Sequence, residues 1–377
     1  MKNILIVSHY IRFLLQFELD NVRILQEMGY RVNYATNYME ENMYEDAKEE
    51  VEKKGVILHQ VDFVRSPYNV RANIKAFHQL RQLMEEEHFD GVDCHTPMAG
   101  AIARMAAHAT DTMPVIYTAH GFHFYKGCSI QNKLIYKNAE RFLAKYTDAL
   151  LTINHEDFSS AQKFRLRGKA YYIPGVGVDV DRISTLKPDK TCRKQLGIPE
   201  DAFVFASTGE LNKNKNHETT IKAFKKAAIP NSYYIICGAG ELRDYLNDVI
   251  CRENLENRVL LLGFRTDVAT LLNVSNVFLF PSIREGLGLA AVEAMAAGLP
   301  VIAADNRGSR ELAQNGWDGI LCEANNIEAF ASEMKKFYLN YSGKSETNVE
   351  AARNFDIKTV DEKMRTIYHD VLDSREK

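Results

Sequence analysis

The sequence contains little proline, has no paired cysteines and lacks a long apolar run. Its 6 cysteines include no C-x-x-C pair, which argues against both a disulfide framework and a structural zinc site. With 9 prolines, 46% hydrophobic and 26% charged residues, the composition excludes a disordered or fibrous chain. The first apolar run, residues 4–7, is too short for a signal peptide and predicts a buried strand. A globular protein of the reducing cytoplasm is therefore expected.

The length and the hydrophobic pattern together predict two α/β domains. A chain of 377 residues exceeds the roughly 250–300 residues at which one hydrophobic core usually stops growing. Short apolar segments alternate with helical patterns along the whole chain, which is typical of βαβ units and parallel sheets. The predicted strands cover residues 4–7, 31–35, 92–95, 114–118, 149–152, 170–173, 203–207, 233–237, 259–262, 277–280 and 301–303.

The same pattern indicates where the domains divide. We expect two Rossmann-like, doubly wound domains at residues 1–178 and 196–357, joined by an irregular polar linker at 179–195. A helical segment at 358–377 is expected to pack back onto the first domain. Because open parallel sheets bind ligands at the carboxyl ends of their strands, the predicted site lies in a cleft between the two domains.

Residues 280–300 form the most informative segment, F-P-S-I-R-E-G-L-G-L-A-A-V-E-A-M-A-A-G-L-P. Gly286 and Gly288 permit close approach of the backbone to a ligand, and the helix that follows attracts an anion to its N-terminus. Glu285 and Glu293 would accept hydrogen bonds from hydroxyl groups on either side of that anion. The alternative is an ordinary strand-to-helix turn in which Glu285 favours the helix dipole and Glu293 is solvated.

The pattern P-S-x-x-E-G-x-G-L-x-x-x-E-A-M-A-x-G-x-P-V-I resembles the signature of retaining glycosyltransferase family 4, which has the two-domain GT-B architecture. The resemblance implies that Glu285 contacts the sugar of a nucleotide-sugar donor and that Glu293 contacts the nucleotide ribose. The other donor-binding residues that it implies in this segment are Arg284, Gly286, Leu287, Gly288 and Leu289.

A second segment of the family lies upstream, where residues 206–217 read A-S-T-G-E-L-N-K-N-K-N-H. It resembles the G-R-L-x-x-x-K-N loop, so Lys215 matches the lysine that neutralises the donor diphosphate, with Gly209 and Glu210 beside it. Glu210 stands where an arginine is commoner, which removes one expected cationic contact. Without the resemblance, Lys215 would instead be read as part of a solvated charge run.

Two further loops are assigned to the donor with less specific motifs. Gly238 lies in C-G-A-G-E, and Arg265 lies in L-G-F-R, where related enzymes place a glycine turn and a contact near the nucleobase. Arg243 occupies the position of the third glycine of a dinucleotide fingerprint, which argues against a nicotinamide cofactor.

In the first half, T-A-H-G-F-H-F-Y at residues 118–125 follows a predicted strand. The T-x-H-G element resembles family members that act on lipid-linked oligosaccharides, in which the histidine faces the donor sugar, and His120 takes that role. His120 and His123 as a partial metal site, or as packing residues, are the alternatives. Since no acidic or third histidine ligand lies at a recognisable spacing, no metal ion is expected.

The first half is also basic, with ten Lys and Arg against five Asp and Glu between residues 101 and 172. Lys133, Lys137 and Arg141 recur every four residues among aromatic side chains, which suits an anionic membrane surface carrying a polyprenyl diphosphate acceptor. A solvated helix face is the alternative. His9 and Arg12 follow the first strand, where many family members have glycines, and they are assigned to the acceptor side.

The resemblance implies a retaining enzyme that moves a hexose or N-acetylhexosamine from a UDP-sugar to a lipid-linked glycan in surface polysaccharide or glycoconjugate synthesis. No metal, no other cofactor and no nucleic acid partner is expected. The protein would be cytoplasmic and peripheral on the inner face of the membrane. The alternatives are a nucleotide-sugar epimerase of the same fold, which needs no acceptor, and a non-catalytic nucleotide-sugar-binding subunit.

Overall fold

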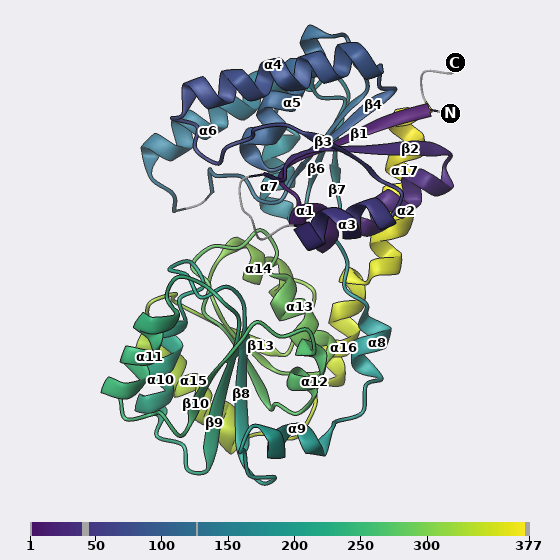
Figure 1. Cartoon of the computed structure of the whole chain (residues 1–377). Helices are drawn as coiled ribbons and strands as arrows, with labels where there is room; N and C mark the ends of the chain where they lie inside the picture. The colour runs from purple at the N-terminus through teal and green to yellow at the C-terminus, as the bar shows by residue number, and fades with distance from the viewer. Residues whose placement is uncertain (1, 40–44, 126, 374–377) are drawn as a thin grey trace. The chain divides into compact units, whose positions relative to one another are not determined.

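The computed structural model describes residues 2–39, 45–125 and 127–373. The chain divides into two compact units, one made of residues 1–176 with 360–377 and the other of residues 177–359 (Figure 1). Each unit is a parallel sheet with helices packed on it. No helix in the described ranges combines the length and the apolar character needed to cross a lipid bilayer.

The first unit is built on a seven-stranded parallel sheet in the order β3-β2-β1-β4-β5-β6-β7. Its central strands are almost wholly buried, as expected for parallel strands that are covered on both faces. The chain order reverses between β1 and β4, which makes the carboxyl ends of these two strands the topological switch point. The strands are β1 (Lys2–Tyr10), β2 (Tyr30–Asn37), β3 (Ile57–Gln60), β4 (Gly91–His95), β5 (Val115–Ala119), β6 (Ala149–Thr152) and β7 (Lys169–Tyr172).

Three helices of the first unit, α4, α6 and α7, begin after a side chain that accepts from a free backbone N–H group. The side chain of Asn69 caps the longest helix, α4, and Ser129 caps α6. The helices are α1 (Arg12–Phe17), α2 (Leu19–Glu27), α3 (Glu45–Lys53), α4 (Val70–Glu87), α5 (Pro97–Ala109), α6 (Ile130–Leu143), the 3-10 turn η1 (Ala144–Tyr146) and α7 (His155–Ala161). The final helix, α17 (Ile357–Leu372), belongs to this unit from Val360 onward, where the Tyr368 hydroxyl donates to Asp93 Oδ2 on β4 at 2.6 Å.

The second unit repeats the topology with six parallel strands in the order β10-β9-β8-β11-β12-β13. Here the switch point lies between β8 and β11. The strands are β8 (Phe203–Thr208), β9 (Ser232–Cys237), β10 (Val259–Gly263), β11 (Val277–Phe280), β12 (Val301–Ala304) and β13 (Gly319–Cys322). The helices are α8 (Val180–Ser184), α9 (Lys190–Gln195), α10 (His217–Ala227), α11 (Arg243–Arg252), α12 (Val268–Asn273), α13 (Leu289–Ala296), α14 (Arg307–Ala313), α15 (Ile327–Leu339), α16 (Glu346–Ala352) and the 3-10 turn η2 (Arg353–Phe355).

The predicted α/β class with two doubly wound parallel sheets is confirmed. The sequence missed β3 and β13, which are the short outer strands of their sheets. Each pairs with a neighbour on one side, and their partial exposure breaks the apolar run that marks a central strand.

The segment at 179–195 is not the irregular linker that we expected. It contains α8 and α9 and lies within the second unit. The polar residues that looked like linker composition are helix caps: Asp179 accepts a hydrogen bond from the Arg182 N–H at 3.0 Å, and Asp189 accepts one from the Thr191 N–H at 2.8 Å.

Candidate active site

In the second unit, the two loops that carry the predicted donor residues leave neighbouring strands at the switch point. Lys215 lies in the loop after β8, and Glu285 lies in the turn after β11. Lys215 Nζ is 2.6 Å from Glu285 Oε1, and the two side chains are 22% and 14% exposed. Residues that are 70 positions apart in sequence thus form one ion pair at the carboxyl edge of the sheet.

Polar contacts join the lysine loop to the glutamate turn. The Asn212 side chain accepts from the Lys215 N–H at 3.0 Å. The Ile283 N–H donates to the Asn214 carbonyl at 2.8 Å, and Asn214 Nδ2 donates to the Arg284 carbonyl at 2.9 Å. The asparagines of this loop therefore hold the lysine against the turn, while the Arg284 side chain is exposed.

The glycine turn requires its glycines for steric reasons. Gly288, at φ +99°, caps α13, and a Cβ atom there would lie 2.7 Å from the Phe280 ring. A Cβ atom on Gly308 would lie 2.5 Å from the Leu287 carbonyl oxygen. Behind this tight turn α13 begins at Leu289, and the N–H groups of a first helical turn lack intrahelical acceptors. That arrangement is suited to an anion.

Gly238 occupies an equally close contact with the neighbouring loop. A Cβ atom on Gly238 would lie 1.8 Å from the Gly209 carbonyl oxygen. The two glycines therefore let the loops after β8 and β9 pack directly against each other. Glu210 is exposed and accepts a hydrogen bond from Asn212 Nδ2 at 2.8 Å.

Glu293 and Arg265, the residues assigned to ribose and base, differ in their contacts. Burial raises the pKa of Glu293, and the Arg182 charge opposes that shift. The Glu293 backbone carbonyl accepts from the Ala297 N–H at 3.0 Å, and only burial and the Arg182 charge act on its carboxyl group among the described residues. Arg265 is already paired, since its Nε and Nη2 atoms lie 2.7 and 2.6 Å from the Asp267 carboxylate oxygens.

His217, which the sequence analysis did not single out, is buried at the start of α10. Burial and the nearby Lys215 charge lower its pKa to about 4. The sequence signal that could have identified His217 is its position directly after Lys215 and Asn216. The neutral ring places no second cation beside Lys215.

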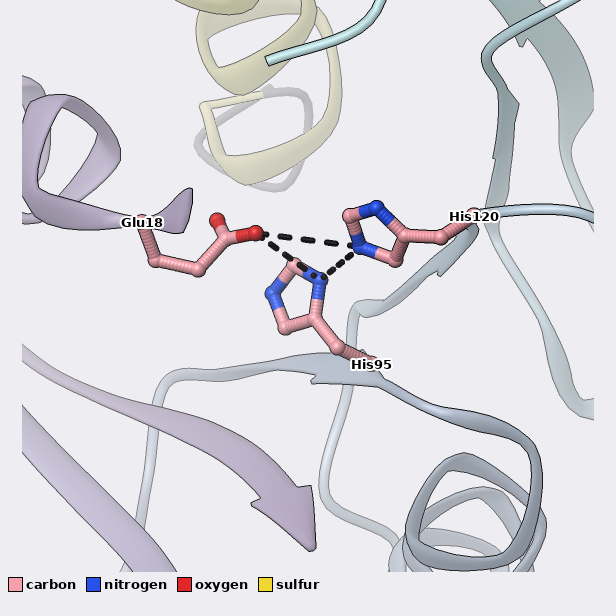
Figure 2. Close-up of side chains that lie close together, drawn as sticks. All are labelled: Glu18, His95 and His120. Carbon is pink, nitrogen blue, oxygen red and sulfur yellow. Dashed lines mark hydrogen bonds and ion pairs between the residues drawn. The ribbon is translucent and has the colours of Figure 1, made fainter. Parts of the chain in front are cut away.

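In the first unit, the fold brings His120 together with two residues that the sequence analysis did not assign. His120 follows β5, His95 ends β4, and Glu18 lies between α1 and α2. His120 Nε2 is 3.3 Å from His95 Nδ1 and 3.8 Å from Glu18 Oε1 (Figure 2). His123, the other histidine of the loop, lies against the Tyr136 ring at a centroid distance of 5.0 Å.

Burial controls the electrostatics of this group. It lowers the pKa of His120 to about 4 and that of His95 well below its usual value. It raises the pKa of Glu18, to which the Asp93 charge also contributes, and raises the pKa of Asp93 to about 7. The neutral forms of all four groups are thus favoured by their surroundings.

The residues assigned to the acceptor side are all in the first unit, with different surroundings. His9 is buried, and burial together with the Arg65 charge lowers its pKa to about 4. Arg12 pairs with Asp46 at 2.9 Å. On α6, the predicted basic residues Lys133 and Arg141 are exposed and Lys137 is half-buried. Exposed apolar side chains of the same helix lie beside them, namely Ile130, Leu134, Ile135 and Phe142.

Comparison with known proteins accounts for both halves of the chain. The family model described as Glycosyltransferase Family 4 matches residues 19–182, and the model described as Glycosyl transferases group 1 matches residues 188–355.

Two relatives match across most of their length. A Bacillus subtilis (strain 168) protein named as the glycosyltransferase EpsD is 34% identical over 85% of this chain and 84% of its own. An Escherichia coli UDP-Gal:alpha-D-GlcNAc-diphosphoundecaprenol alpha-1,3-galactosyltransferase is 32% identical over 80% of each chain. Among solved structures, Anabaena Alr3699/HepE in complex with UDP and glucose matches with a TM-score of 0.77 at 20% identity, over 98% of this chain and 100% of that one.

Proposed function

The chain belongs to glycosyltransferase family 4 and is a nucleotide-sugar-dependent enzyme of polysaccharide or lipid-linked glycan synthesis, and from this premise we propose its reaction in detail. It transfers a hexose or N-acetylhexosamine from a UDP-sugar to a glycan on a polyprenyl diphosphate lipid, with retention at the anomeric carbon. The Escherichia coli relative, which is named for a UDP-Gal donor and a diphosphoundecaprenol acceptor, supports this choice of substrates.

The observation that carries the proposal is the contact between Lys215 and Glu285 at the switch point. A lysine held 2.6 Å from a carboxylate, next to a glycine turn and a helix N-terminus, provides adjacent cationic and hydroxyl-accepting positions. A nucleotide sugar needs both, because its diphosphate is anionic and its sugar carries hydroxyl groups.

In the proposed reaction, Lys215 and the backbone amides from Gly286 to Leu289 stabilise the diphosphate as the glycosidic bond breaks. Glu285 accepts hydrogen bonds from the sugar, and Glu293 accepts them from the ribose. Because the lysine and the helix N-terminus neutralise the diphosphate, this step needs no divalent cation there. The acceptor hydroxyl attacks from the face that the diphosphate leaves: its bond to the anomeric carbon forms as the bond from that carbon to the diphosphate breaks, its proton passes to a diphosphate oxygen, and no covalent glycosyl-enzyme forms.

The remaining assigned residues complete the proposed binding of donor and acceptor. His120 orients the donor sugar. Arg265 and Gly238 lie on the nucleobase side, and His9 and Arg12 lie on the acceptor side. Arg265 would keep its pairing with Asp267, which holds the guanidinium plane in position.

The surface of α6 supports a membrane-bound acceptor. Lys133, Lys137 and Arg141 form a basic row, and Ile130 and Leu134 lie beside it, with Ile130 77% exposed. The helix carries one acidic residue, Glu140, which is paired with the buried Arg104 at 2.9 Å. A cationic and apolar helix face suits the cytoplasmic surface of an anionic membrane. Sedimentation with anionic liposomes at low salt is expected, and a protein that stays wholly in the supernatant would contradict it.

Thermal stabilisation by nucleotide sugars tests the donor. A ligand that binds only the folded state raises the melting temperature. Among UDP-, GDP- and ADP-linked sugars, one UDP-sugar should raise it, equally with and without EDTA. No shift with any donor would contradict the proposal. Release of free sugar without an acceptor would instead identify an epimerase, and NMR of the transferred product reads the anomeric configuration directly.

A further inference from the structure

Three buried or partly buried side chains of the first unit point their donor atoms at one another (Figure 2). They are the Oε1 atom of Glu18, the Nδ1 atom of His95 and the Nε2 atom of His120. Glu18 and His95 are each 1% exposed, and His120 is 25% exposed. The side chains come from three separate parts of the chain, so no short motif announces them.

The separations between these atoms match the size of a metal ion. They are 3.3 Å between the two nitrogens, 3.4 Å from Glu18 Oε1 to His95 Nδ1 and 3.8 Å from Glu18 Oε1 to His120 Nε2. A point equidistant from all three atoms therefore lies about 2 Å from each, within the range of about 2.0–2.2 Å found for zinc bonds to imidazole nitrogen and carboxylate oxygen.

Hydrogen bonds among Glu18, His95 and His120 cannot pair all three of their facing atoms. His95 Nδ1 faces both Glu18 and His120 at more than 3.2 Å, and one proton on that nitrogen serves only one of them. Within the described residues, the ion pairs of Glu18 and Asp93 involve only histidines. A cation at the centre would bond all three donor atoms and offset the cost of burying Glu18 in its ionised form.

The groups behind the cluster lie where a metal site places its outer contacts. Asp93 Oδ1 lies 3.4 Å from His95 Nε2, the ring nitrogen that faces away from the cluster, without a hydrogen bond between the two atoms, and Asp93 Oδ2 accepts from the Tyr368 hydroxyl at 2.6 Å. Glu18 Oε2 accepts from Asn21 Nδ2 at 2.6 Å. A carboxylate behind a ligating histidine and a donor behind a ligating carboxylate are the supports that orient metal ligands.

We propose that Glu18, His95 and His120 form a binding site for a divalent transition metal, with Zn²⁺ as the best match. Two imidazoles and one carboxylate suit such ions better than Mg²⁺ or Ca²⁺, which prefer oxygen ligands. Three protein ligands leave a coordination position for water or a substrate oxygen. The inference departs from our expectation of a metal-free chain and does not rest on the donor contacts proposed for the second unit.

Metal binding would also define the proton position on His120. An ion on Nε2 leaves the ring proton on Nδ1, because a neutral imidazole has one donor and one acceptor nitrogen. His120 would then present an N–H donor at Nδ1. That is the form that an orienting contact to a sugar hydroxyl oxygen uses.

The test is metal titration of the full-length, tag-free protein after treatment with EDTA and dialysis, in the absence of nucleotide sugar. We expect one Zn²⁺ per chain in competition with a chromophoric chelator, a Co²⁺ spectrum of the intense four-coordinate type, and no displacement by a tenfold excess of Mg²⁺. Glu18→Gln and His95→Gln should each weaken Zn²⁺ binding by about 100-fold or more, and Asp93→Asn by about 10–100-fold.

Two matched controls separate this site from surface binding. His123→Ala removes the neighbouring histidine of the same loop, and His369→Ala removes an exposed histidine that pairs with Asp373 at 2.7 Å. Both should retain wild-type affinity. Less than stoichiometric binding to the wild type, or Zn²⁺ affinity unchanged by both Glu18→Gln and His95→Gln, overturns the proposal.

Circular dichroism checks that each variant folds. If the variants do not fold, the wild-type Co²⁺ spectrum decides, because a weak six-coordinate spectrum also overturns the proposal. A chain that binds zinc but no nucleotide sugar would contradict the proposed function and leave this site intact.

Discussion

In the first unit, Glu18 lies in the connection that follows β1, and His95 is the last residue of β4. In the second unit, Lys215 lies in the loop after β8, and Glu285 lies in the turn after β11. Both pairs therefore occupy the switch point of a doubly wound sheet. The second unit pairs a cation with its carboxylate directly at 2.6 Å. The first unit surrounds its carboxylates with histidines whose pKa values are lowered by burial.

The comparison shows that the switch point of the same sheet topology can hold either an ion pair or a cluster of histidines and carboxyl groups. In the proposed donor site, the paired and partly exposed lysine of the second unit exchanges its carboxylate for an anionic ligand. The cluster of the first unit offers two imidazole nitrogens and a carboxylate oxygen, which are the ligand atoms of the proposed metal site. Substitutions in the two units test this contrast.

The largest expected effect is on catalysis in the second unit. Lys215→Ala should lower sugar transfer by about 10²–10³-fold, because it removes a group that stabilises the leaving diphosphate. The measurement is UDP release in the presence of the lipid-linked acceptor. Lys213→Ala is the matched control, since Lys213 is an exposed lysine of the same loop and should retain nearly full activity. Wild-type turnover in Lys215→Ala would remove the donor site from this position.

The second effect concerns the packing of the donor loops. Gly238→Ala should destabilise the second unit by about 3 kcal/mol, because the new Cβ atom would meet the Gly209 carbonyl. Gly197→Ala, at φ +70° with no atom within 4 Å, should cost only about 1 kcal/mol for its backbone conformation. Urea unfolding followed by the fluorescence of Trp317, the single tryptophan, measures both. Equal losses would show that the loop contact is not tight.

The third expected effect is a pH dependence of the stability of the second unit. His217 is the one histidine of the sequence between 177 and 359, and its pKa falls from the ordinary 6.5 to about 4 on folding. The unfolded state therefore binds more protons between pH 6.5 and 4, so stability falls as the pH is lowered through that window. From pH 7.5 to 5 the loss should be about 2 kcal/mol.

His217→Gln should remove that slope from the Trp317-detected transition. His78→Gln, which changes an exposed histidine of the first unit, should leave it unchanged. A slope that persists in His217→Gln would assign the pH dependence to other groups.

The smallest effect compares one buried tyrosine in each unit. The Tyr368 hydroxyl donates to the Asp93 carboxyl at 2.6 Å, whereas the Tyr234 hydroxyl contacts the Ser207 and Thr220 hydroxyls at 2.7 and 2.9 Å. Tyr368→Phe should cost about 2 kcal/mol and Tyr234→Phe about 1 kcal/mol, since the Asp93 carboxyl, with a pKa of about 7, is partly ionised near neutral pH and hydrogen bonds to charged groups are stronger. Hydrogen exchange of β4 and β9 amides measures each unit separately. A larger loss in Tyr234→Phe would contradict the contrast.

The sequence was most informative where local pattern and local structure coincide. The central strands are marked by short apolar runs, such as residues 4–7, and the glycine turn before α13 uses residues whose conformations follow from their own chemistry, such as Gly288 at φ +99°. The pattern was less informative at β3 and β13, where edge strands are short and half-exposed. It also failed at α8 and α9, since the same aspartates serve as linker residues or helix caps.

The sequence by itself determined the two α/β repeats and the family, because each depends on contiguous segments with characteristic spacing. Only the tertiary structure decided that Glu18, His95 and His120 converge and that Asp93 and Tyr368 lie behind them. Strand order places β4 between β1 and β5, and α17 returns to β4 from the end of the chain. Such neighbours are set by the pairing of distant strands, which leaves no periodicity in the sequence between them.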